Sequence, residues 1–165
     1  MSARDVFERL RGYLSGVDDD ELWAEDVVVE TPFAVPGRAR RIEGRAAFLD
    51  RARAGRAALP FRLEMSDVVV HETRDPDVVI VEYELGATLP GTGERRSAPF
   101  IGVLRARDGQ VVLWREYQDP LRVAAATGHL PEVLAAARQA MADVPPGGQD
   151  AIAGQDAIAG QDAIA

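Results

Sequence analysis

The stretch Asp108-Gly-Gln-Val-Val-Leu-Trp114-Arg-Glu116-Tyr-Gln118-Asp-Pro120 decides how the fold of this chain is interpreted. Asp108-Gly109 is a two-residue hairpin turn, because glycine tolerates the positive φ that such turns require. The following residues mix branched and aromatic side chains with polar ones, which predicts a half-buried strand. Alternation along a strand places Trp114, Glu116 and Gln118 on one face. That face is either an ordinary strand rim or the wall of a pocket.

Composition limits the function classes. The chain has 165 residues, 47% apolar and 28% charged, which suits one soluble globular domain with a real core. The net charge of −8 argues against nucleic acid and membrane as partners, because both require basic surfaces. The chain has no cysteine, so disulfides and thiolate chemistry are excluded. The first residues lack the apolar segment of a signal peptide, so we expect a cytoplasmic protein.

The first third of the chain predicts helices and one strand. Phe7, Leu10 and Leu14 recur at helical spacing. Asp18 begins an acidic N-cap pattern, and Pro32 ends a run of valines. The predicted elements are a helix over residues 3–15, a short helix from Asp18 through Trp23, a strand over 27–32, a loop through Gly44 and a helix over 45–56.

The middle of the chain predicts strands alone, separated by turn residues. These strands cover residues 61–72, 78–87, 97–107 and 110–119. Successive hairpins form an antiparallel sheet, and helices segregated from such a sheet make an α+β layer fold. After Pro120 two further helices are predicted, over residues 121–127 and 131–143.

The end of the chain repeats Gly-Gln-Asp-Ala-Ile-Ala three times within residues 148–165. One isoleucine per repeat buries too little surface to offset the entropy of ordering the chain. We therefore predict one folded domain over residues 1–144 and a disordered low-complexity tail over residues 145–165. A docking peptide is the alternative interpretation of this tail.

The order of the elements and two motifs resemble the SnoaL-like family of the nuclear transport factor 2-like superfamily. The motifs are Glu25-Asp-Val-Val-Val-Glu30-Thr-Pro32 and Trp114-Arg-Glu116-Tyr-Gln118-Asp-Pro120, with the helix start Glu43-Gly-Arg-Ala-Ala-Phe48 between them. This resemblance covers about residues 4–120. It implies a curved antiparallel sheet wrapped around N-terminal helices, which forms a cone with a deep apolar pocket, with an extra C-terminal helix beyond it. Members include polyketide cyclases, ketosteroid isomerase, limonene epoxide hydrolase, scytalone dehydratase and proteins that only bind.

The last hairpin is similar, without gaps, to that of limonene epoxide hydrolase, whose catalytic aspartate matches Glu116. This match implies that Trp114 and Gln118 face into the cone. The hydrolase's arginine and second aspartate fall near Glu82 and Glu84, allowing a one-residue shift. A glutamate in place of the arginine argues against the hydrolase's Asp-Arg-Asp relay.

Ketosteroid isomerase offers a second comparison by resemblance. Its base position falls near Thr31 and its oxyanion acid near Gly102. Thr31 cannot serve as the base, and Gly102 cannot serve as the acid. Steroid isomerisation by that mechanism is therefore not expected.

Four carboxylates are the candidate catalytic residues: Glu30, Glu82, Glu84 and Glu116. If two of them face an apolar cone they resist ionising together, so that one serves as general acid and the other as general base. The alternative is that Glu82 and Glu84 lie in solvent while the opposite face of their strand packs the core. The candidate residues for substrate binding are Trp114, Gln118, Phe33, Phe100, Tyr13 and Trp23.

We predict no metal and no cofactor. His71 and His129 are far apart and lie near turns, where surface histidines are expected, and there is no phosphate-binding glycine loop. Arginines are frequent between residues 38 and 56. They form either a solvated face that offsets the acid excess or a rim that attracts a carboxylate, a phosphate or a carrier-bound substrate.

The sequence thus predicts cofactor-free acid–base conversion of a small, mostly apolar metabolite, as in polyketide or terpenoid metabolism. The outcome would be cyclisation, isomerisation, hydration or dehydration. Two alternatives stay open: a non-catalytic ligand-binding or dimeric scaffold protein, and an epoxide-opening enzyme with a carboxylate pair. Two inward carboxylates within about 5 Å would favour an enzyme, and exposed ones a binding protein.

We also expect a homodimer through the outer face of the sheet, as in many members of the family. The residues behind this expectation are those that would face outward if the two glutamates pointed inward: Val79, Val81, Tyr83 and Leu85. An apolar outer face requires a partner.

The repeated tail provides the first testable prediction. Truncation after Val144 should leave the melting temperature and any activity unchanged, because residues 145–165 lack a core-forming pattern. Thermal unfolding of the full and truncated chains measures this. A drop of several degrees in the truncated protein would show instead that the repeats dock on the domain.

Overall fold

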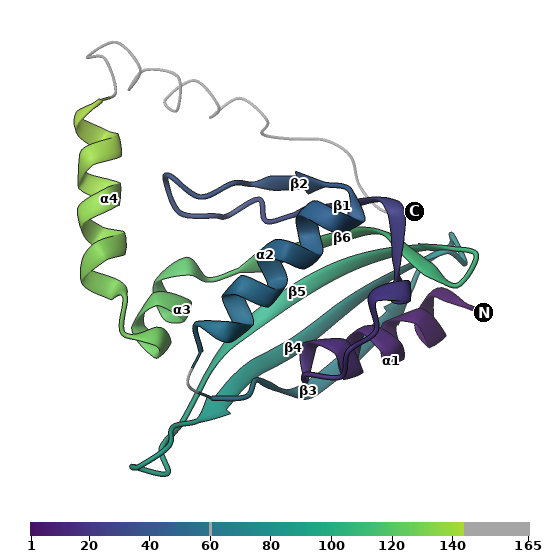
Figure 1. Cartoon of the computed structure of the whole chain (residues 1–165), viewed down its shortest axis with the longest axis horizontal. Coiled ribbons are helices and arrows are strands. Elements are labelled where there is room, and N and C mark those ends of the chain that lie inside the picture. The colour runs from purple at the N-terminus through teal and green to yellow at the C-terminus, as the bar shows by residue number, and fades with distance from the viewer. Residues whose placement is uncertain (60, 144–165) are drawn as a thin grey trace, which may run out of the picture.

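A computed structural model describes residues 1–59 and 61–143, so the predicted tail lies outside the described residues. Helices precede and follow a run of strands, as expected (Figure 1). In chain order the elements are α1 (Ala3–Leu14), a 3-10 turn (Asp20–Leu22), β1 (Trp23–Glu30), β2 (Arg41–Glu43), α2 (Arg45–Ala57), β3 (Glu64–Glu72), β4 (Val78–Thr88), β5 (Arg95–Arg107), β6 (Gln110–Gln118), α3 (Pro120–Thr127) and α4 (Leu130–Ala142).

The strands form one curved, open sheet in the order β2-β1-β6-β5-β4-β3. All neighbours are antiparallel except β1 and β6, which run parallel, so the expectation of a purely antiparallel sheet was wrong at this one pair. The reason is that β6 ends the series of hairpins beside the N-terminal strand, which no hairpin joins to it. Helices α1 and α2 lie against one face of the sheet, and α3 and α4 gather at one end (Figure 1). The predicted α+β class and curved sheet are confirmed.

Two predictions near the N-terminus were wrong in their bounds. The short helix ends at Leu22 and the strand begins at Trp23, because Trp23 pairs with Val111 of β6 and is buried in the core. The loop expected up to Gly44 contains β2, a three-residue strand paired with the end of β1. A strand this short shows no alternation in the sequence, so its pattern could not reveal it.

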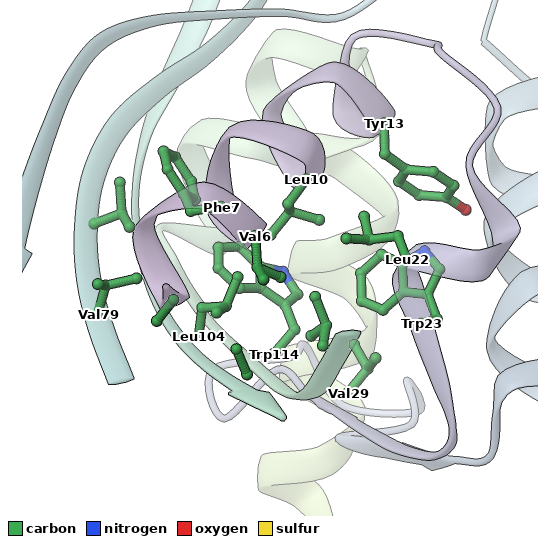
Figure 2. Packing of buried hydrophobic residues seen from close by; sticks show 14 of the residues in the cluster. Val6, Phe7, Leu10, Tyr13, Leu22, Trp23, Val29, Val79, Leu104 and Trp114 are labelled. Atoms are coloured by element: carbon green, nitrogen blue, oxygen red, sulfur yellow. The ribbon is translucent and has the colours of Figure 1, made fainter. Parts of the chain in front are cut away.

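Helix α1 fills the concave side of the sheet. Ser2 begins it with a capping box, in which its hydroxyl accepts from the Asp5 N–H and the Asp5 carboxylate accepts from the Ser2 N–H. The inward face then buries apolar side chains at helical spacing, among them Val6, Phe7 and Leu10. Figure 2 shows these residues packed between the sheet residues Leu104 and Trp114 and the segment around Trp23. Each buried side chain of this size stabilises the fold by about 1.5–3 kcal/mol.

Strand β4 presents its valines inward and its glutamates outward. Val79, Val81 and Tyr83 are buried, whereas Glu82 is exposed on the opposite face. The apolar face on which the homodimer was predicted therefore packs the core instead of meeting a partner. Other apolar side chains do lie exposed around Glu82 on the outer face, namely Val69, Ile80 and Ile101. A homodimer through this face stays a prediction.

Gly102 of β5 lies directly against the ring of Trp114 of β6. A Cβ on Gly102 would lie 2.6 Å from Cζ3 and 2.8 Å from Cζ2 of the indole, and closer still to Cη2. Trp114 is only 3% exposed, so its ring has no open space to move into. Glycine at this position therefore allows the ring to lie against the backbone of β5.

Gly102→Ala should destabilise the protein by about 1–3 kcal/mol, because the new methyl group overpacks the site of the Trp114 ring. Denaturant unfolding measures the change. The matched control is Gly55→Ala in α2, where nothing lies within 4 Å of the new Cβ and a gain of about 0.5–1 kcal/mol is expected. If Gly102→Ala were as stable as the wild type, the ring would not be held against β5.

Candidate functional site

The candidate site centres on Glu116, which projects from β6 into the concave side of the sheet. Its side chain accepts a hydrogen bond from the hydroxyl of Tyr83, on β4. The Tyr83 ring stacks on Phe100, with ring centroids 5.4 Å apart and planes at 10°, and lies 6.4 Å from the Trp114 ring. One carboxyl group is thus held by a tyrosine among aromatic side chains.

A cavity of about 240 Å³ opens in front of this carboxyl group. The sheet supplies Phe100, Glu116 and Gln118 as one wall, and α3 supplies Val123 and Thr127 as another. The segment between α2 and β3 closes a third side with Leu59, Phe61 and Leu63. We call this space the Glu116 cavity, and most of its lining is apolar.

Burial in this environment changes the titration of both partners. It raises the pKa of Glu116, and hydrogen bonds from the Tyr83 and Trp114 side chains oppose that shift without cancelling it. Burial also raises the pKa of Tyr83 well above its usual value, and the neighbouring charge of Glu116 adds to the effect. Tyr83 therefore stays a protonated donor, and Glu116 keeps its proton to a higher pH than an exposed glutamate does.

Glu30 is held differently, by two arginines on the β2–β1–β6 edge. Its carboxylate accepts from Arg115 at 2.5 Å and from Arg41 at 2.5 Å. These contacts lower its pKa, with the Arg115 hydrogen bond as the largest cause. Glu30 is thus a charged carboxylate in ion pairs with arginines on the two neighbouring strands, and it does not lie beside Glu116.

Glu82 and Glu84 lie on the outer face, away from Glu116. The Glu82 carboxylate is exposed and lies 2.8 Å from the His71 ring. Glu84 is half-buried on the same face, and its Oε2 has no hydrogen-bond partner among the described residues. Of the four candidate glutamates, all within the described residues, only Glu116 faces the concave side of the sheet. They therefore do not form the predicted pair of inward carboxyl groups.

The predicted binding residues divide into three groups. Phe100 and Gln118 line the Glu116 cavity, and Trp114 packs behind it. Phe33 lies on the outer face, 58% exposed, edge-on to Tyr117 at 5.4 Å between ring centroids. The third group lies in the core beside Phe48, away from the Glu116 cavity: Tyr13 and Trp23.

Tyr83 is a candidate site residue that the sequence analysis did not identify. The alternation of β4 does place it on the valine face, which indicates burial, but no local pattern links it to Glu116. That link depends on β5 lying between β4 and β6 in a register that pairs Tyr83 with Phe100 and Gly102 with Glu116.

The described residues contain no group of three histidine, cysteine or acidic side chains that could hold a metal ion. None of the described helices is long and apolar enough to cross a membrane.

Comparison with known proteins places the chain in a family. The model of the SnoaL-like domain matches residues 10–114. An uncharacterized PhzA/B-like protein from Pseudomonas aeruginosa is 36% identical over 108 residues, which cover 66% of this chain and 75% of that protein.

Two solved structures show the same fold. A provisionally assigned isomerase from Bacillus subtilis has a TM-score of 0.67 and 30% identity, over 77% of this chain and 93% of that one. A nuclear transport factor 2-like protein from Anabaena variabilis has a TM-score of 0.57 and 14% identity, over 71% of this chain and 86% of that one. The chain therefore belongs to the SnoaL-like domain family and has the nuclear transport factor 2-like fold.

Proposed function

We propose that the protein moves a proton within a small carbonyl compound bound in the Glu116 cavity, and so acts as an acid–base isomerase or cyclase. The observation that carries this proposal is a single carboxyl group with a raised pKa at the wall of an apolar cavity. The likeness to a provisionally assigned isomerase agrees with this reaction class.

The proposed step is proton abstraction beside a carbonyl group. The ionised Glu116 takes the proton of a C–H bond next to the carbonyl, and the electrons of that bond move to the carbonyl oxygen as an enolate. The protonated Glu116 then returns the proton to a different carbon, which shifts a double bond. In the cyclisation branch, the enolate carbon instead attacks a second carbonyl carbon and closes a ring, and the oxygen of that carbonyl takes the proton back from Glu116. The substrate keeps its composition, so no other reactant is needed.

Two neighbours support this step. The Tyr83 hydroxyl donates to Glu116 and so fixes the orientation of the carboxyl group. The Gln118 side chain lines the same cavity, where its amide N–H groups would stabilise the enolate oxygen. The small apolar cavity suits a compact ring or a short chain.

Non-catalytic binding is the second candidate function. It is favoured by the lack of a second inward carboxyl group among the four predicted candidates. The same observation removes support from epoxide opening by a carboxylate pair, since Glu82 and Glu84 lie on the other face.

Glu116→Gln should lower turnover by roughly 100-fold or more, because glutamine keeps the shape of the side chain but cannot exchange the proton. The assay uses a β,γ-unsaturated cyclic ketone, whose conversion to the conjugated isomer is followed by ultraviolet absorbance. The matched control is Glu82→Gln, the same change on the outer face, which should keep the wild-type rate. Thermal melting confirms that both variants fold.

Full activity of a folded Glu116→Gln variant would contradict the proton-transfer role. Binding of the ketone by wild-type protein without any isomerisation would favour the second candidate function.

A further inference from the structure

A second cavity, of about 260 Å³, adjoins the Glu116 cavity on the far side of Gln118. It lies where the β1–β2 hairpin, α2, α3 and α4 meet at one end of the molecule (Figure 1). Its floor is apolar, with Val29, Ala34 and Ile42 among the lining residues. We call it the basic pocket for the four side chains that give it its character: Arg38, Arg40, Arg51 and His129.

The charge of this pocket is opposite to that of the chain as a whole. The protein carries a net charge of −8, yet no aspartate or glutamate is among the described residues that line the pocket. Elsewhere arginines pair closely with carboxylates, as Arg41 does with Glu30 and Arg53 with Asp20. Within residues 1–59 and 61–143, none of the three pocket arginines has such a partner.

Guanidinium groups gathered without a counter-charge repel one another and attract an anion. Arginine is also the side chain best suited to a carboxylate, because its planar donors match the two oxygens of that group. An apolar floor under several arginines is therefore a site for the acidic end of an organic molecule.

Three residues line both cavities, namely Gln118, Val123 and Thr127. Glu116 and Gln118 are two positions apart on one strand face, which separates their Cα atoms by roughly 7 Å. One small molecule can therefore place its apolar body beside Glu116 and its charged end among the arginines. Repulsion from an ionised Glu116 opposes the reverse orientation.

We propose that the basic pocket binds the carboxylate of the same small molecule whose apolar body occupies the Glu116 cavity. This inference rests on the proposed function for the reacting part of the ligand, and it adds the substrate class: a compact carbonyl compound that bears a carboxylate. The three pocket arginines then fix which carbon faces Glu116, because the Glu116 cavity offers an anion only Arg96 among its described lining arginines, and Arg96 is paired with Glu94.

The test measures binding of benzoate and of its uncharged analogue benzamide by calorimetry. Benzoate should bind more tightly than benzamide, and its affinity should fall as salt is added. Arg51→Gln should lower the affinity for benzoate by roughly tenfold and leave the affinity for benzamide unchanged, because the substitution removes charged hydrogen-bond donors. The matched control is Arg53→Gln, two positions along α2 and paired with Asp20 outside the pocket, which should bind benzoate as the wild type does.

Three results would overturn the inference. The first is that benzoate does not bind, or binds no more tightly than benzamide. The second is that both arginine variants lower the affinity for benzoate equally. The third is that inorganic phosphate binds more tightly than benzoate. Because the measurement is of binding, it is independent of proton transfer: Glu116→Gln should bind benzoate at least as tightly as the wild type, whatever its turnover.

Discussion

The contact between the Trp114 ring and the backbone at Gly102 is the constraint on which the site depends. It fixes β6 against β5 at the one place where β5 has no side chain on its inner face. The same pairing sets Gly102 opposite Glu116 and Phe100 opposite Gln118, so the carboxyl group reaches over the glycine to Tyr83 on β4. Any larger residue at position 102 displaces the ring, and with it the wall of the cavity.

A carboxyl group in this position costs stability, and the sign follows from the direction of its pKa. The folded protein holds the Glu116 proton more tightly than the unfolded chain, whose pKa lies near the ordinary value of 4.5. Its favourable contribution to stability is therefore fully present below that value and is lost as the pH rises through the raised pKa. Above the raised pKa, the packed aromatic core around Trp114 and Tyr83 must offset this cost.

Much of the fold could be predicted from the sequence, because the alternation of apolar and polar residues in the strands and the helical spacing of apolar residues in α1 are local patterns. Less of the candidate site could be predicted in this way. The motif predicted Glu116 as a candidate. Glu82 and Glu84 were competing candidates, because alternation shows that two residues share a face without showing which face is buried. The partnership of Tyr83 with Glu116 depends on the register of three strands, and the basic pocket depends on how loops and helices distant in sequence meet. Neither arrangement leaves a local pattern.

The titration of Glu116 itself tests its proposed role in proton transfer most directly. Carboxyl-carbon NMR over a range of pH follows each glutamate, and the resonance missing in Glu116→Gln identifies the residue. We predict a midpoint above 4.5 for this resonance, because burial disfavours the charged carboxylate. A midpoint at or below 4.5 would contradict this prediction, since Glu116 would then lack the raised pKa on which its proposed role in proton transfer depends.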